Sequence, residues 1–336
     1  MTNRSENANQ INTLNMGVKG LNRFITINCR KGVKEMNIYQ LKNKKIVIDI
    51  NMYLYQYKSH STIIEGLYEL MITLENFQIT PIFIFDGVSP IEKRGLLSKN
   101  KEEKLRAEKK YNSLKREGVV GKQLDNLKRK CLRLTTDDMN NARELIEAYG
   151  LKHYTAPGEA EQLCAKMVKM NLAYACLSED SDLFLYGCAR ILKKLDLNKC
   201  CVTMYNMNTI LYELNLTLDE LKEIVVLCGT DYNFELAKYM NVYQIHELYK
   251  KYCQKKKELA AGKRLSFYDY LFNNKNNYKI EDFCKACNYQ NYYNVIFMFS
   301  TDNVSINGLR MDLKNPEFKD VERVRDILKQ DNFIYV

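Results

Sequence analysis

The sequence predicts an α/β fold with a central, mostly parallel sheet flanked by helices, on the strength of two observations. Three apolar runs, KKIVIDI, TPIFIFDG and LAYACLSEDSD, are continuous instead of alternating, which is typical of strands buried on both faces of a parallel sheet. Helical segments lie between these runs, and the alternation of strands with helices indicates an α/β protein.

The helices follow from local signals, taken in chain order. One is expected over residues 62–75, between the first two apolar runs. Another begins at the capping sequence TTDD of residues 135–138 and ends at Tyr149-Gly150. The stretch APGEAEQLCAKMV, residues 156–168, opens on a Pro-Gly turn and continues with apolar residues at helical spacing. A further helix over residues 217–228 leads into the sequence GTDY.

Charge and cysteine usage narrow the class of protein. The 336 residues carry 51 lysines and arginines against 41 aspartates and glutamates, a net charge of +10 that indicates an anionic partner without separating nucleic acid from an acidic protein or membrane surface. The sequence has no run of about 18 apolar residues and no signal peptide, so no membrane partner is expected. Eleven scattered cysteines, including an isolated Cys284-x-x-Cys287, indicate reduced intracellular thiols.

Seven carboxylates fall where the predicted elements place a ligand site. They are Asp49, Asp86, Glu159, Glu161, Asp180, Asp182 and Asp231. In open α/β sheets such sites lie beyond the carboxyl ends of the strands, and the three apolar runs end in aspartates. The two glutamates sit at a helix start, where both can turn toward one point, and Asp180 and Asp182 face the same way if that stretch is extended. Any single member is explained as well by a helix cap or a surface charge, but the shared placement favours one common site.

A cluster of this kind predicts divalent cations. Without a counter-charge, some of the carboxylates would have to hold protons at neutral pH. Ligation by oxygen atoms alone suits Mg²⁺ or Mn²⁺ and not zinc. Two such ions about 3.5–4 Å apart can activate a water molecule and stabilise the leaving oxygen of a phosphodiester.

Six ordered motifs between residues 16 and 233 carry a resemblance to a known family. They are MGVKGL, VIDINMYLYQY, FDGVSPIEKRG, APGEAEQLCA, SEDSDLFLYG and LCGTDYN. In these motifs the sequence resembles the flap endonuclease/XPG superfamily of structure-specific 5′ nucleases, which implies a 5′-nuclease (PIN-like) fold. The resemblance implies a nuclease core over residues 16–235 and a helical region over residues 236–336 that completes the DNA-binding surface. Residues 1–15 are polar and are expected to be a disordered extension.

The resemblance also implies residue roles. Two ions would be held by Asp86, Glu159 and Glu161 on one side and by Asp180, Asp182 and Asp231 on the other, with Asp49 in support. Lys93 matches the catalytic lysine of the family, and the basic residues 92–133 match a helical arch that passes a 5′ single strand. The DNA-binding residues implied by the match are Gly17, Lys19, Tyr55, Arg94, Lys99, Lys101 and Lys104.

The sequence departs from the family pattern in four places. Asn100 stands where the family has an arginine, although Lys99 and Lys101 flank it. The segment KSHST, residues 58–62, is much shorter than the family's wedge and 3′-flap pocket. The sequence after GTDY contains no glycine-rich hairpin for duplex and monovalent-cation binding. No sliding-clamp motif is recognisable at the C-terminus.

The expected function is therefore a metal-dependent 5′ nuclease, a flap endonuclease or a 5′→3′ exonuclease, acting on DNA with a 5′ flap, nick or branch in replication, repair or recombination. Alternatives are a four-way-junction resolvase, a catalytically silent DNA-binding scaffold and an RNA-cutting nuclease. The carboxylates and Lys93 disfavour the scaffold, and the long basic segment disfavours the RNA nuclease. An intracellular location is expected, with the nucleus and a cytoplasmic replication site both left open.

Overall fold

A seven-stranded sheet lies at the centre of the part of the chain that the computed structural model describes, residues 17–258, 265–273, 278–313 and 318–331. The extension expected over residues 1–15 lies outside these ranges. The strands are β1 (Val33–Asn37), β2 (Lys45–Asp49), β3 (Thr80–Phe85), β4 (Lys152–Thr155), β5 (Ala175–Leu177), β6 (Arg190–Asp196) and β7 (Cys201–Asn206). Their order is β1-β7-β6-β5-β2-β3-β4; β7 is antiparallel to both of its neighbours and the other pairs are parallel. The predicted mostly parallel sheet is confirmed.

Each face of the sheet has its own apolar core. Along β2, Val47 packs into one core, while Ile46 and Ile48 pack into the other, which is why this strand reads as a continuous apolar run. The first face is covered by α1 (Leu21–Asn28), α7 (Ala160–Lys169), α8 (Asp182–Leu185), α9 (Met207–Leu214) and α10 (Leu218–Val226). The second is covered by α2 (Asn51–His60), α3 (Ile63–Asn76), α6 (Thr136–Ala148) and α16 (Val321–Gln330).

The elements expected from local signals are present. Strands β2, β3 and β5 fall within the three apolar runs, and helices α3, α6, α7 and α10 lie where they were predicted. Thr135 begins α6 with a complete capping box, and Gly150 follows its end at φ +76°. Strands β1, β4, β6 and β7 were not predicted.

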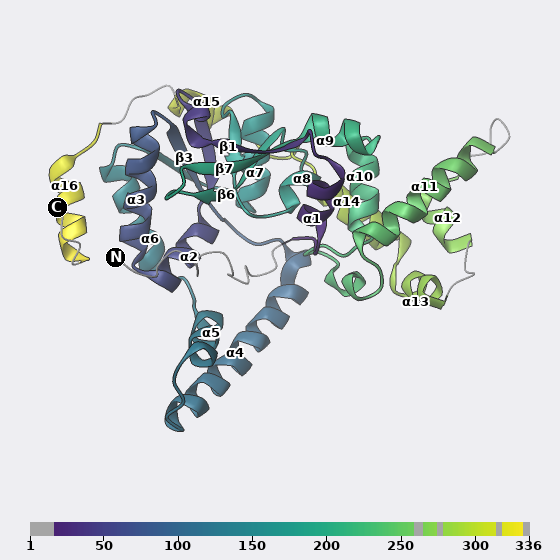
Figure 1. Cartoon of the computed structure of the whole chain (residues 1–336), viewed down its shortest axis with the longest axis horizontal. Helices are drawn as coiled ribbons and strands as arrows, with labels where there is room; N and C mark the ends of the chain where they lie inside the picture. Colours follow the sequence, from purple (N-terminus) through teal and green to yellow (C-terminus); the bar gives the residue numbers. More distant parts are fainter. Residues whose placement is uncertain (1–16, 259–264, 274–277, 314–317, 332–336) are drawn as a thin grey trace.

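Two basic helices project from the body as an arm (Figure 1). They are α4 (Arg94–Arg116), which begins directly after the short 3₁₀ helix η2 (Ile91–Lys93), and α5 (Lys122–Cys131). Ala107 is buried in α4, and α5 buries no residue, so the two helices pack mainly against each other. This pair forms the helical arch expected over residues 92–133.

The C-terminal region is helical, as expected, but its helices lie in separate parts of the molecule. At one end of the molecule lie α11 (Val242–Glu258), α12 (Phe267–Asn273) and α13 (Tyr278–Ala286), while α14 (Tyr289–Met298) packs against α10 (Figure 1). By contrast, α15 (Asn307–Asp312) returns to the sheet, where the Asp312 carboxylate pairs with Lys152 (3.1 Å) and accepts a hydrogen bond from the Tyr154 hydroxyl (2.6 Å).

The last helix, α16, packs through Val324 and Leu328 into the second core. A domain boundary at residue 236 stays a prediction, because α15 and α16 lie against elements that precede it. No described helix combines the length and apolar character that crossing a membrane needs. No disulfide joins any of the eleven cysteines, all of which lie in the described ranges, and both members of Cys284-x-x-Cys287 are buried.

Candidate active site

The sheet brings the carboxylates of distant segments to one edge. Asp49 is the last residue of β2 and Asp86 directly follows β3, which runs parallel to it. Glu159 and Glu161 lie between β4 and the first turn of α7, so β4, which the sequence did not reveal, delivers them to the same edge. Asp180 and Asp182 follow β5, and Asp231 follows α10.

The condition under which Asp180 and Asp182 would face the same way, an extended stretch, is not met. Strand β5 ends at Leu177, Ser181 has a helical backbone, and Asp182 is already the first residue of α8. The Asp182 backbone N–H donates to Oδ1 of Asp180 over 2.8 Å. Both side chains are nevertheless buried at the acidic cluster, because the tight turn replaces the alternation of a strand.

Asp86 and Asp49 tie the surrounding elements together. Asp86 accepts hydrogen bonds from the Asn51 side chain (2.5 Å) and from the Ala160 backbone (2.9 Å), so it fixes the first residues of α2 and α7. Oδ2 of Asp49 accepts a hydrogen bond from the Ser178 hydroxyl over 2.8 Å. These contacts hold the ends of β2, β3 and β5 in one arrangement.

Burial and mutual repulsion raise the pKa values of five of the seven carboxyl groups. Burial, followed by the charges of Asp86 and Asp180, raises the pKa of Asp49 to about 8. The pKa values of Glu161 and Asp182 lie well above the usual range for the same kinds of cause. Asp180 and Glu159 also have raised pKa values, with burial as the main cause. Such a cluster is held ionised at neutral pH only by positive charge placed within it.

Lys93 supplies one such charge at the foot of the arch. Its ammonium pairs with the Glu159 carboxylate and with Oδ2 of Asp231, the latter over 3.0 Å. Burial alone would lower the pKa of Lys93, but the carboxylates of Glu159 and Asp231 raise it. Tyr232 lies beside them: its hydroxyl donates to Oε2 of Glu159 (2.5 Å), and Lys93 Nζ sits 5.4 Å from its ring centroid.

The donor set fits divalent cations that prefer oxygen. Among the described residues, no three acidic, histidine or cysteine side chains stand close enough together, as they are, to hold an ion. The cluster nevertheless consists of carboxylates alone, and Oδ1 of Asp182 is buried without a hydrogen-bond partner. An unpartnered buried oxygen among carboxylates of raised pKa is the chemistry that Mg²⁺ or Mn²⁺ satisfies. The assignment of individual ligands stays a prediction.

Gly17 lies directly against the acidic cluster. Its φ is +76°, and a Cβ atom there would stand 2.2 Å from the Ser181 hydroxyl and 2.6 Å from Oδ1 of Asp180. The neighbouring Val18 N–H donates to the same hydroxyl over 2.7 Å. The sequence resemblance implied a DNA contact for Gly17; the structure also gives it a packing role, because only glycine allows this approach. Lys19, two residues on, is exposed.

The remaining residues with an implied DNA-binding role lie along the arch or at its foot. Lys104 Nζ lies 5.4 Å from the ring centroid of Tyr55, which is half-buried, and Lys99 Nζ lies 5.0 Å from that of Phe234. Arg94 and Lys101 are exposed on α4. The arch is therefore linked to α2 on one side and to the segment after Asp231 on the other.

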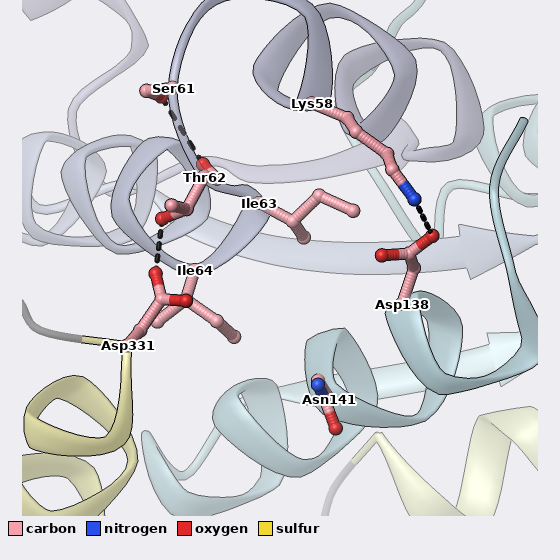
Figure 2. Close-up of a pocket in the computed structure, with 8 residues that line it drawn as sticks. All are labelled: Lys58, Ser61, Thr62, Ile63, Ile64, Asp138, Asn141 and Asp331. Atoms are coloured by element: carbon pink, nitrogen blue, oxygen red, sulfur yellow. Dashed lines mark hydrogen bonds and ion pairs between the residues drawn. The ribbon is translucent and has the colours of Figure 1, made fainter. Parts of the chain in front are cut away.

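The short segment at residues 58–62 lines a cavity of about 270 Å³ (Figure 2). Lys58, at the end of α2, forms an ion pair with Asp138 of α6. Thr62 donates to the Asp331 carboxylate, which directly follows α16. Figure 2 shows these two pairs on either side of Ile63. The turn between α2 and α3 is thus short, but it still borders this cavity.

Sequence reasoning missed several polar residues that support the site. Ser178 and Tyr232 lie within recognised motifs, so proximity to Asp180 and Asp231 was the available signal. Asn51 follows Asp49 by two residues in the same way. Lys193 on β6 is buried against the backbone of Glu179 and Asp180, and nothing in the sequence LKKLD distinguishes it from an exposed lysine.

Two family models match the chain. The XPG N-terminal domain matches residues 16–107 and the XPG I-region matches residues 150–231, and together they span more than half of the chain. Similar proteins include flap endonuclease 1 of Aedes aegypti, 32% identical over 236 residues, and flap endonuclease 1 of Plasmodium falciparum, 31% identical over 248 residues. Each alignment covers 65% of this chain, but the chain spans only 62% and 38% of the lengths of these relatives.

Solved structures share the fold at lower identity. The catalytic core of Rad2 in complex with DNA substrate superimposes with a TM-score of 0.67 at 23% identity, covering 94% of each chain. Human GEN1 in complex with Holliday junction DNA gives a TM-score of 0.65 at 17% identity, covering 94% of this chain and 73% of GEN1. With both family regions matched in order, and with the carboxylates of those regions gathered at one edge of the sheet, the chain belongs to the XPG/flap endonuclease superfamily.

Proposed function

We propose that this chain is a divalent-metal-dependent 5′ nuclease that hydrolyses phosphodiester bonds in DNA with a 5′ flap, nick or branch. One observation carries the proposal: a buried cluster of carboxylates with raised pKa values stands at the foot of a basic helical arch, with Lys93 at the junction. An acidic site suited to cations thus lies beside a basic surface suited to phosphates.

The carboxylates would hold two Mg²⁺ or Mn²⁺ ions. Asp86, Glu159 and Glu161 form one group of ligands, and Asp180, Asp182 and Asp231 form the other, with Asp49 in support. When bound, the ions supply an activated water and stabilise the charge of the leaving oxygen. The chain's own contribution is to fix these oxygens in place through the Asn51, Ser178 and backbone contacts.

Lys93 is the group in this site that is suited to the scissile phosphate. Its ammonium is held at the base of α4 by Glu159 and Asp231, so a small rotation of a flexible side chain carries the charge toward a phosphate beside the cluster. Positive charge placed where negative charge develops lowers the barrier to phosphoryl transfer. Tyr232 supports this arrangement, because its hydroxyl holds Glu159 when Lys93 moves away.

The arch and the charge balance of the chain support DNA as the partner. Lysines on the exposed surface of α4 can track successive phosphates, and the half-buried Tyr55 offers an aromatic face beside Lys104. Affinity from such contacts falls steeply with salt. An intracellular location is part of the same proposal, since the cysteines, all in the described ranges, form no disulfide.

A single substrate panel tests this function. Purified protein is incubated with Mg²⁺ and labelled 5′ flap, nick, blunt duplex, bubble, four-way junction and RNA. We expect metal-dependent cleavage of flapped or nicked DNA that EDTA abolishes. Preference for the four-way junction would assign the resolvase function instead, and binding without cleavage on every DNA would leave only the scaffold.

A further inference from the structure

A buried lysine other than Lys93 contacts the backbone of Glu179 and Asp180. Lys193 belongs to β6, and its side chain is 1% exposed. Its ammonium donates to the backbone carbonyl of Glu179 over 2.8 Å and to that of Asp180 over 2.7 Å. The ring of Phe184, in α8, lies 5.3 Å from Nζ.

Alternation along β6 places this side chain on the same face of the sheet as Ile191, which packs into the first core. The pairing of β6 with β7 is irregular between Lys193 and Asp196, and Lys194 has a φ of +55°. Lys194 turns outward, while its backbone N–H donates to the Glu179 carboxylate. Irregularities of this kind re-aim side chains near functional sites. Lys193 through its side chain and Lys194 through its backbone thus join β6 to Glu179 and Asp180.

The surroundings of Lys193 explain why a charge is used there. An ammonium buried in this way is tolerated only when it is hydrogen-bonded and near negative charge. Two carbonyl oxygens and the neighbouring carboxylates of Glu179 and Asp180 meet this condition. A carbon chain of the same length would leave both carbonyls without these donors. Lys193 therefore holds the backbone of the residue that also presents the Asp180 carboxylate.

We propose that Lys193 is a positioning residue that fixes the Glu179–Asp180 backbone and thereby sets the affinity of the acidic cluster for divalent cations. This inference rests on the proposed metal-dependent nuclease. It assigns no contact between Lys193 and the substrate, because the Lys193 side chain is buried. Groups that orient metal ligands in this way commonly change metal affinity about 10–100-fold when they are lost.

The test compares Lys193→Met with Lys194→Met in the full chain. Both substitutions remove one positive charge from adjacent positions of β6, but only the first removes the two hydrogen bonds. Isothermal titration with Mn²⁺ in the absence of DNA measures the ion affinity, and thermal unfolding is recorded for each protein. We expect Lys193→Met to weaken ion binding about 10–100-fold, while Lys194→Met binds as the wild type does.

Other outcomes overturn the proposal. Unchanged ion affinity in a destabilised Lys193→Met would reduce Lys193 to a core-filling residue. Tighter binding would mean that only its charge acts on the ions. A wild-type chain that binds no Mn²⁺ would refute the proposed metal-dependent function itself. The failure of this inference is different, because there the wild type binds Mn²⁺ and Lys193→Met binds it equally well.

A measurement on the wild type covers the case in which Lys193→Met does not fold. In protein labelled with ¹⁵N-lysine, a buried ammonium with two carbonyl partners gives a slowly exchanging NMR signal. We expect that signal, assigned through Lys193→Arg, to shift during a Mg²⁺ titration, with the same midpoint as a calorimetric titration of the wild type with Mg²⁺. An ammonium signal that stays in place while calorimetry records ion binding would overturn the proposal.

Discussion

Replacing Gly17 by alanine tests whether the N-terminal segment shapes the acidic cluster. The left-handed backbone at φ +76° costs a residue with a Cβ about 1–2 kcal/mol. The new Cβ would also stand 2.2 Å from the Ser181 hydroxyl, 2.6 Å from Oδ1 of Asp180 and 2.7 Å from Oδ1 of Asp182. Because carbon–oxygen contacts are normally about 3.3–3.6 Å, the loop or the N-terminal segment must retreat by about 1 Å.

Gly20 provides the matched control. It has nearly the same backbone, at φ +82°, but an added Cβ meets nothing within 4 Å. The backbone alone should therefore cost each alanine variant about 1–2 kcal/mol of unfolding free energy, and the close contacts should make the loss larger in Gly17→Ala. Only Gly17→Ala should also weaken Mg²⁺ binding and slow single-turnover cleavage of a 5′ flap, by about 100-fold for a shift of this size. Equal ion affinity and cleavage in the two variants would refute a packing role for Gly17.

Three further predictions concern the arch, the segment after Asp231 and the N-terminal extension. Lys93→Ala should slow single-turnover flap cleavage by about 10²–10³-fold. Asn100→Arg should raise the rate, because a guanidinium can bind two phosphate oxygens. If Asn100→Arg had no effect and Lys99→Ala slowed cleavage as much as Lys93→Ala, the phosphate-binding cation of the arch would be Lys99 and position 100 would be misaligned with the arginine of the family. Cleavage should gain little from K⁺ over Na⁺ at matched ionic strength, since the chain after Asp231 forms a 3₁₀ helix and α11 without a glycine hairpin; a strong K⁺ preference would contradict this. A chain that begins at Met16 should cut at least as well as the whole chain, and a large loss would give residues 1–15 a role.

The strands that the sequence predicted are those that are buried on both faces of the sheet. Strands β2, β3 and β5 are covered on both faces, so they leave continuous apolar runs that are visible in the sequence. Strand β4 is an edge strand whose four residues, KHYT, are half-buried or exposed, and β6 combines apolar residues with lysines. Such strands are fixed by pairing with their neighbours, and no local pattern in the sequence predicts them.

The site was predictable where chain position determines chemistry. Asp49 and Asp86 end strands, and parallel strands bring their carboxyl ends to one edge, so their convergence followed from the fold class. The turn between Asp180 and Asp182 did not follow, because the sequence does not show where β5 gives way to α8. Lys193 could not be predicted for a different reason: the sequence LKKLD does not show which of its two lysines is buried and hydrogen-bonded to Glu179 and Asp180.

The measurement that tests the central claim most directly is cleavage of a 5′-flap DNA in a Mg²⁺ titration by the wild type, Asp86→Asn and Asp180→Asn, with DNA binding measured in parallel. Amide for carboxylate keeps the size of the side chain and removes the charge that holds a cation. The account predicts Mg²⁺-dependent cleavage by the wild type, loss of cleavage in both variants, and nearly unchanged DNA binding, because affinity for DNA comes mainly from basic side chains and backbone contacts. Cleavage near the wild-type rate by either variant would contradict the assignment of this cluster as the metal-dependent active site.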